Sequence, residues 1–250
     1  MRTTLLIGSL LFSAIAAAAE PVPIAIHSRH VLDIKTGTSS DAFIVVRGER
    51  IAAIEHTAPA GARVIDLGDA TLLPGFIDAH THIIGRELND PQSENSAVRD
   101  YDGTGAIIGV ANAQKTLLAG FTTIRNVGAP NFDDMALRKV IGEGIVIGPR
   151  MQNAGYAIGI TGGHCDENGF RPGLVNLGPI DGVADGPEQI RQAVRLQIKY
   201  GADVIKTCAT GGVLSEGDAV GATQYSFEEL KALVDEAKKL DRFCFPDEAR

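Results

Sequence analysis

Two histidines stand two residues apart, directly after an apolar stretch, in the run Pro-Gly-Phe-Ile-Asp-Ala-His-Thr-His at residues 74–82. In a β-strand, residues i and i+2 point to the same side, so His80 and His82 can both reach one metal ion. Imidazole suits zinc and other first-row metals. Asp78 shares this side of the strand, where we expect its carboxylate to orient a metal-bound histidine through a hydrogen bond. The alternative is a strand that merely ends in two surface histidines.

A lysine and a third histidine lie in two further segments. Lys206 sits in an apolar strand, where a charged and unpaired ammonium group is costly, so the alternative to a chemical role is a pair with a neighbouring carboxylate. His164 lies in a glycine-rich loop at residues 159–166, and glycines allow the backbone to approach a ligand closely. We expect His164 to contact substrate or to stabilise an oxyanion, and Tyr156 to line the same opening of the active site. The alternative for His164 is a solvated loop position.

The elements that must position these residues alternate between strand-like and helix-like segments. Strands are expected at 76–79, 122–126, 150–154 and 204–208, and helices near 104–119, 133–141, 187–200 and 227–240. The last helix opens with Ser226 followed by Glu229, which is a capping-box pattern. Alternating strands and helices indicate parallel βα units. His80, His82, the loop of His164 and Lys206 all fall at C-terminal ends of expected strands, where barrel enzymes build their active sites.

The residues before this region follow other patterns. Residues 20–73 contain short β runs separated by turn residues, which predicts a small β-sheet subdomain. Residues 1–19 have a positive start, an apolar middle and an Ala-Ala-Ala end, as in a secretory signal peptide. The apolar run is too short for a comfortable membrane span. We therefore expect export to the periplasm or outside the cell, with no membrane attachment after cleavage; the alternative is an uncleaved anchor. The βα units form a separate expected domain at residues 74–250.

Composition narrows the classes of partner. The chain has 250 residues, 44% of them hydrophobic, which is ample for a core, and a net charge of −8 argues against nucleic acid or an anionic membrane surface. This net charge is compatible with a small-molecule substrate. Three cysteines, Cys165, Cys208 and Cys244, show no Cys-x-x-Cys spacing and no disulfide framework. We expect all three to be buried or half-buried free thiols; the alternative is that two of them pair in an exported chain.

Several of these segments resemble one known family. Residues 74–82 resemble the first-strand signature of the amidohydrolase superfamily, and residues 116–128 resemble its helix-to-second-strand segment. Gly162-Gly163-His164, and Asp203 to Lys206 with Gly211-Gly212, resemble its third and fourth strand ends. The set is most similar to the imidazolonepropionase-like and Xaa-Pro or Xaa-Arg dipeptidase-like branch. The resemblance implies an α/β fold: about the first four βα units of a TIM-type (β/α)8 barrel, preceded by a small β-sheet subdomain of the composite β-sandwich kind.

The resemblance also implies a reaction. Relatives hydrolyse C–N bonds of small amide or peptide-like substrates with a metal-activated water. It implies one or two divalent metal ions held by His80, His82 and Lys206, and these ligand types favour zinc. In many relatives the matching lysine is carboxylated by carbon dioxide to N6-carboxylysine. Burial disfavours the charged form of a lysine, and the neutral amine is the form that reacts.

Part of the family pattern has no counterpart. The family places two more histidine ligands after strands five and six and an aspartate base after strand eight, whereas no histidine follows His164. A fifth strand begins plausibly near residue 241, but Pro246 and nearby charges break its pattern. We therefore expect a C-terminally truncated member. The alternatives to an active hydrolase are a catalytically incomplete exported fragment and a half-barrel that needs a partner chain. Its open edges would favour self-association, which leaves a homo-oligomer open.

Overall fold

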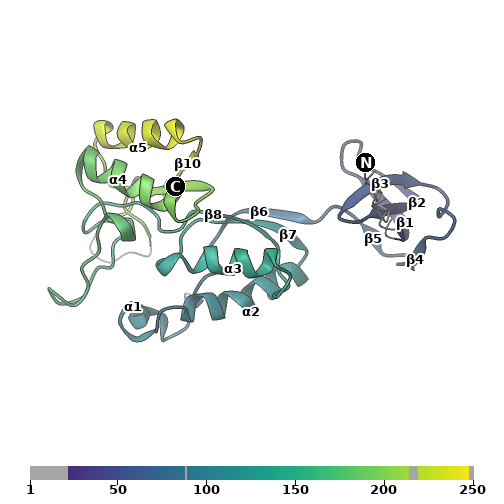
Figure 1. Ribbon diagram of the computed structural model, residues 1–250, viewed down its shortest axis with the longest axis horizontal. Coiled ribbons are helices and arrows are strands. Elements are labelled where there is room, and N and C mark those ends of the chain that lie inside the picture. The colour runs from purple at the N-terminus through teal and green to yellow at the C-terminus, as the bar shows by residue number, and fades with distance from the viewer. Residues whose placement is uncertain (1–21, 88, 214–218, 248–250) are drawn as a thin grey trace, which may run out of the picture. The chain divides into compact units, whose positions relative to one another are not determined.

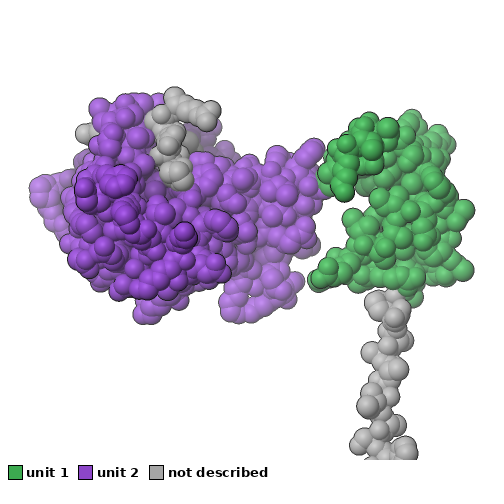
Figure 2. All heavy atoms as spheres, turned by 90° about the horizontal axis from the view of Figure 1, so that it is seen from above, with its two compact units in different colours: residues 1–74 green, residues 75–250 purple. Residues whose placement is uncertain are grey.

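The computed structural model describes residues 22–87, 89–213 and 219–247, so the expected signal peptide at residues 1–19 lies outside the described residues. The chain divides into two compact units, residues 1–74 and 75–250, which Figure 2 shows in green and purple. All of the candidate site residues belong to the second unit.

Residues 22–74 of the first unit form one five-stranded sheet. Its strands are β1 (Ile24–Asp33), β2 (Thr38–Arg47), β3 (Arg50–Glu55), β4 (Arg63–Asp66) and β5 (Thr71–Leu72). β2 pairs antiparallel with β1 and β3, whereas β4 and β5 run parallel to β1. Ala25, Val31, Ala42 and Val45 form its buried apolar positions. The second layer expected of a composite β-sandwich is not among the described residues and stays a prediction.

The described residues of the second unit form five parallel strands. They are β6 (Phe76–Thr81), β7 (Phe121–Asn126), β8 (Arg150–Asn153), β9 (Val204–Cys208) and β10 (Phe243–Asp247). β6, β7 and β8 form one sheet, and β9 pairs with β10. Two contacts join β8 and the segment after it to β9. One is a hydrogen bond of 2.8 Å from Asp203 N to Asn153 O, and the other is a parallel bridge between Ile158 and Thr207. The first four strands lie where the sequence predicts them.

Helices connect these strands, because parallel neighbours need long crossovers. They are α1 (Ser96–Arg99), α2 (Thr104–Leu118), α3 (Asp133–Gly142), α4 (Gly186–Lys199) and α5 (Phe227–Lys239), with short 3₁₀ turns η1 (Ser93–Asn95), η2 (Pro130–Phe132) and η3 (Pro179–Asp181). Within the described part of the chain, each helix is too short or too polar to cross a membrane.

Two apolar clusters hold the helices to the strands (Figure 1). α2 and α3 pack together beside β7, around Ile124 and Leu137. α4 and α5 pack together around Ile190 and Leu233, in a cluster that includes Ile205 of β9. The predicted capping box of α5 is confirmed, because Glu229 N donates to Ser226 Oγ (3.3 Å) and Ser226 N donates to Glu229 Oε2 (2.8 Å).

One sequence expectation about the end of the chain is wrong. Pro246 was expected to break a fifth strand, yet β10 runs through it and pairs in register with β9. Proline lacks an amide donor, but an edge strand can accommodate it on its unpaired side. Among the described residues β10 has β9 as its one neighbour, and β6 at the other end pairs with β7 alone. Phe76 and Ile77 of β6 are accordingly exposed, at 51% and 72%.

Candidate active site

β6 ends at Thr81, so it carries His80, and His82 directly follows the strand. The two imidazole centroids lie 5.4 Å apart. Pairing with β7 shifts register between Asp78 and Thr81, so the strand is irregular where it carries His80. Asp78 Oδ1 accepts a hydrogen bond of 3.0 Å from the amide of His80. The carboxylate therefore fixes the backbone of this histidine, and its expected role in orienting a metal-bound histidine stays a prediction.

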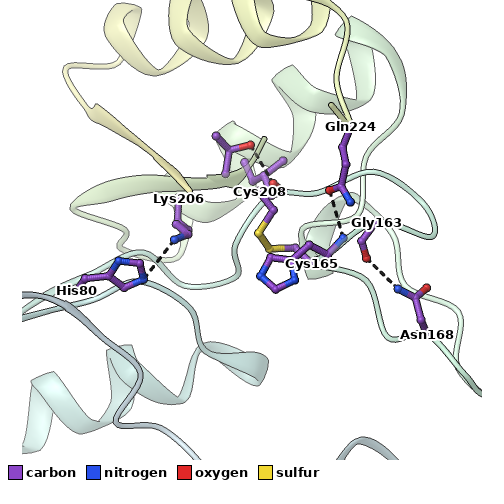
Figure 3. The surroundings of a disulfide bond; sticks show 10 residues. His80, Gly163, Cys165, Asn168, Lys206, Cys208 and Gln224 are labelled. Atoms are coloured by element: carbon purple, nitrogen blue, oxygen red, sulfur yellow. Dashed lines mark hydrogen bonds between the residues drawn. A yellow bond between two sulfur atoms is a disulfide. The ribbon is translucent and has the colours of Figure 1, made fainter. Parts of the chain in front are cut away.

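Lys206 is the buried centre of the site. Every residue of β9 is buried, and Lys206 is only 1% exposed. Its Nζ lies 3.4 Å from His80 Nε2, although the two residues are 126 positions apart (Figure 3). Phe245 of β10 is the third member of this contact: its ring meets His80 edge-on at 5.4 Å between centroids, and Lys206 Nζ lies 5.3 Å from its centre. Sequence reasoning missed Phe245 because Pro246 argued against a strand there.

A glycine lies behind the second histidine. A β-carbon added at Gly128 would stand 3.3 Å from Nδ1 and from Cε1 of His82, tighter than an ordinary contact. Gly128 is the last residue of the family-like segment 116–128 and lies just after β7. Because it has no side chain, the imidazole of His82 can lie close to its backbone. A residue with a side chain there would have to push His82 away by a few tenths of an ångström.

The donor set fits part of a metal site. His80 and His82 supply two imidazoles, and a carboxylated Lys206 would add oxygen donors beside His80. Catalytic zinc sites take three protein ligands. Within residues 22–87, 89–213 and 219–247, no group of three His, Cys, Asp or Glu side chains is arranged to hold a metal ion. A third ligand from the described residues would therefore have to be Lys206 in its carboxylated form.

His164 lies in a loop that is fixed at several points. Its amide donates to Gln224 Oε1 (3.2 Å), and the side chain of Asn168 donates to Gly163 O (2.9 Å) (Figure 3). A β-carbon at Gly212 would stand only 2.1 Å from His164 Nδ1, so the imidazole rests directly on this glycine. Nδ1 is buried and has no hydrogen-bond partner among the described residues.

Tyr156 is engaged elsewhere. Its hydroxyl accepts a hydrogen bond of 2.7 Å from Asn131 N, and its ring packs edge-on against Phe132. Burial raises the pKa of the Tyr156 hydroxyl, so it stays neutral at physiological pH. The structure thus ties Tyr156 to the turn before α3, and its expected contact with substrate stays a prediction.

The expectation that all three cysteines are free thiols is wrong. Cys165 and Cys208 form a disulfide, with Cα atoms 6.0 Å apart, and Cys244 is the free cysteine among the described residues (Figure 3). The 43-residue separation gave no local signal, because only the parallel contact of the segment after β8 with β9 brings the two together. Burial raises the pKa of the Cys244 thiol to about 11.

Known proteins with similar sequences are hydrolases. The model of the amidohydrolase family matches residues 71–243. The chain is 33% identical to ochratoxinase from Aspergillus niger over 187 residues, which cover 68% of this chain and 38% of that protein. A stretch of 46 residues, 18% of this chain, is 48% identical to 12% of an imidazolonepropionase from Arthrobacter sp. (strain FB24).

Solved structures of hydrolases also resemble this chain. A Xaa-Pro dipeptidase with methionine bound in its active site superposes with a TM-score of 0.81 and 33% identity, over 90% of this chain and 56% of that one. The A. niger ochratoxinase structure gives a TM-score of 0.73 and 28% identity, over 91% of this chain and 56% of that one. These neighbours imply an α/β fold of the TIM-barrel type. The chain spans 38% of the curated ochratoxinase and 56% of these solved chains. With the family model matched over most of its length, and as its motifs predict, the chain belongs to the amidohydrolase family.

Proposed function

We propose that this chain carries the first metal-binding face of a hydrolase that cleaves amide-type C–N bonds with a metal-activated water. The observation that carries the proposal is the approach of His80 and Lys206 to 3.4 Å across 126 residues of sequence. Relatives named as an ochratoxinase and a Xaa-Pro dipeptidase support a small amide or peptide-like substrate. We also propose that β6 to β10 form the first part of a TIM-type barrel, with the site at the strand ends.

Each residue has a distinct role in this proposal. His80 and His82 would hold a divalent ion, with zinc favoured by the nitrogen ligands, and carboxylated Lys206 would complete the ligands or bridge a second ion. A bound metal would supply a nucleophilic water and polarise the substrate carbonyl. The carbamate would form by addition of carbon dioxide to the neutral amine of Lys206, which is buried within β9. Asp78 would hold the backbone of His80 in place, and His164 would contact the substrate carbonyl.

A second candidate is that the chain binds metal but needs another polypeptide for catalysis. The exposed Phe76 and Ile77 on the outer edge of β6 favour it, because an unpaired apolar strand edge invites another strand. We keep export to the periplasm or outside the cell as part of the proposal. The Cys165–Cys208 disulfide supports it, since disulfides persist mainly in oxidising compartments.

Metal content tests the proposal directly. The purified chain would be loaded with zinc chloride and ¹³C-bicarbonate, dialysed, and analysed for bound zinc and for a carbamate signal by ¹³C NMR. We expect bound zinc in the wild type, its loss in His80→Ala and His82→Ala, and loss of the carbamate signal in Lys206→Ala. His30→Ala, a histidine variant in the first unit, is the matched control and should keep both. A wild-type chain without bound zinc would refute the metal site.

Hydrolysis separates the two candidates. The zinc-loaded chain would be assayed with Xaa-Pro dipeptides and N-acyl amino acids. Turnover that disappears in His80→Ala but persists in His30→Ala supports a complete hydrolase. Zinc binding without turnover supports the second candidate. In either case Asp78→Ala should weaken zinc binding by about 10- to 100-fold, the usual effect of removing a group that orients a metal ligand.

A further inference from the structure

The Cys165–Cys208 disulfide joins two parts of the candidate site. Cys208 is the last residue of β9 and stands two positions after Lys206, so the two side chains leave the strand on the same side. Cys165 directly follows His164 in the glycine-rich loop. The covalent link therefore ties the loop that carries His164 to the strand that carries Lys206 (Figure 3).

The loop is shaped to bring Cys165 to this position. At its start, Ile158 N donates to Lys206 O and Cys208 N donates to Ile158 O, both at 2.9 Å, so the chain enters the loop alongside β9. It then turns back on itself so tightly that a β-carbon at Gly159 would stand 2.7 Å from Cβ of Cys165. The crosslink thus closes a loop whose entry is already fixed on β9.

His164 depends on the same closure. The imidazole of His164 rests on Gly212, and Gln224 accepts a hydrogen bond from its amide. Both partners lie in the segment after β9, the strand to which the disulfide ties the loop. The disulfide is the covalent connection between the loop of His164 and that side of the site. Cys165 is partly buried whereas Cys208 is 1% exposed, so the loop residue is the more exposed partner of the bond.

We propose that the Cys165–Cys208 disulfide is a reversible clamp that positions His164 over the strand end of Lys206, so that the oxidation state of this pair sets how well the site works. This rests on the proposed function for its catalytic consequence, but not for the clamp itself. In reduction by a dithiol, one thiolate attacks Sγ of Cys165 and displaces the thiolate of Cys208. The second thiol then releases Cys165, and the reductant leaves as its own disulfide, with two electrons and two protons transferred to the protein.

The first measurement establishes the bond and the position of His164 without any assay of activity. Alkylation of the unfolded chain should label Cys244 alone before reduction and all three cysteines after it. Imidazole NMR signals of histidine-labelled protein, with His164 assigned through His164→Gln, should then move for His164 on reduction and in Cys165→Ala. The signal of His27 in the first unit should stay, and Cys244→Ser should leave His164 unchanged. Labelling of all three cysteines without reductant, or an unmoved His164 signal, would overturn the clamp.

The second measurement concerns the reaction. Displacement of a positioned group by about 1 Å can cost about 100-fold in rate, so reduction or Cys165→Ala should lower kcat/KM by about 10- to 100-fold, with restoration on reoxidation of the wild type. Cys244→Ser should match the wild type. If the His164 signal moves but neither redox form hydrolyses substrate, the proposed function fails while the clamp stands. If both forms hydrolyse equally well, the link between the clamp and the site is refuted.

Discussion

Asp134 allows the sharpest test of how this fold handles a buried charge. It is the second residue of α3 and is fully buried. Oδ2 accepts a hydrogen bond of 3.0 Å from Gly155 N, whereas Oδ1 has no hydrogen-bond partner among the described residues. Burial raises the pKa of Asp134 from its ordinary 3.8 to about 6, although the hydrogen bond from Gly155 acts in the opposite direction.

The sign of the effect on stability follows from this pKa. Because the folded-state pKa lies above the unfolded value, the folded chain binds the proton more tightly. The stabilisation from protonated Asp134 is fully present below about pH 4 and is lost as pH rises through about 6. A shift of about two pKa units corresponds to roughly 3 kcal/mol of unfolding free energy. At pH 8 the ionised carboxylate therefore costs the fold about that much.

We expect Asp134→Asn to remove this pH dependence. The amide oxygen can still accept from Gly155 N, and the side chain no longer ionises. Relative to the wild type, the variant should gain unfolding free energy as pH rises from 4 to 8, by up to about 3 kcal/mol. Glu228→Gln, at an exposed position of α5, is the matched control and should show a change of well under about 1 kcal/mol.

Urea unfolding followed by tyrosine fluorescence makes the measurement specific. The chain has no tryptophan, and its four tyrosines all lie in the second unit, which contains Asp134. Unfolding free energies at pH 4.5, 6 and 8 would be compared between the variant and the wild type. A difference that stays constant over this range, or that shrinks as pH rises, would refute the argument that burial opposes ionisation of Asp134.

Three further predictions concern other contacts. Hydrogen bonds to Asp41 and Asp66 raise the pKa of His27. Its stabilising effect is therefore present below pH 6.5 and is lost as the pH rises above the raised pKa. Relative to the wild type, His27→Gln should accelerate amide hydrogen exchange in the first unit more at pH 5 than at pH 9. Gly212→Ala would place a β-carbon 2.1 Å from His164 Nδ1 and should lower the urea-unfolding free energy by about 1–3 kcal/mol, with an altered His164 NMR signal. Cys165→Ala opens a disulfide that spans 43 residues, and loop-closure entropy predicts a loss of about 4 kcal/mol by the same assay, against no loss for the wild type treated with reductant and then reoxidised.

Local patterns in the sequence were sufficient for most elements of the second unit. β9 lies at residues 204–208 as expected, and α5 starts at its predicted capping box. Such signals succeed because strand alternation, helix periodicity and capping all act between residues close in the chain. The closeness of His80 and His82, whose ring centroids lie 5.4 Å apart, is local in the same way, because only one residue separates them in the chain.

The sequence by itself therefore determined the family, the order of the parallel units and the residues whose side chains could take part in chemistry. The tertiary structure alone decided which of them meet. The approach of Lys206 to His80, the ring of Phe245 beside both, and the bond between Cys165 and Cys208 all join segments far apart in the chain. No local propensity encodes such contacts, because they arise only when the parallel strands align and their C-terminal ends come together.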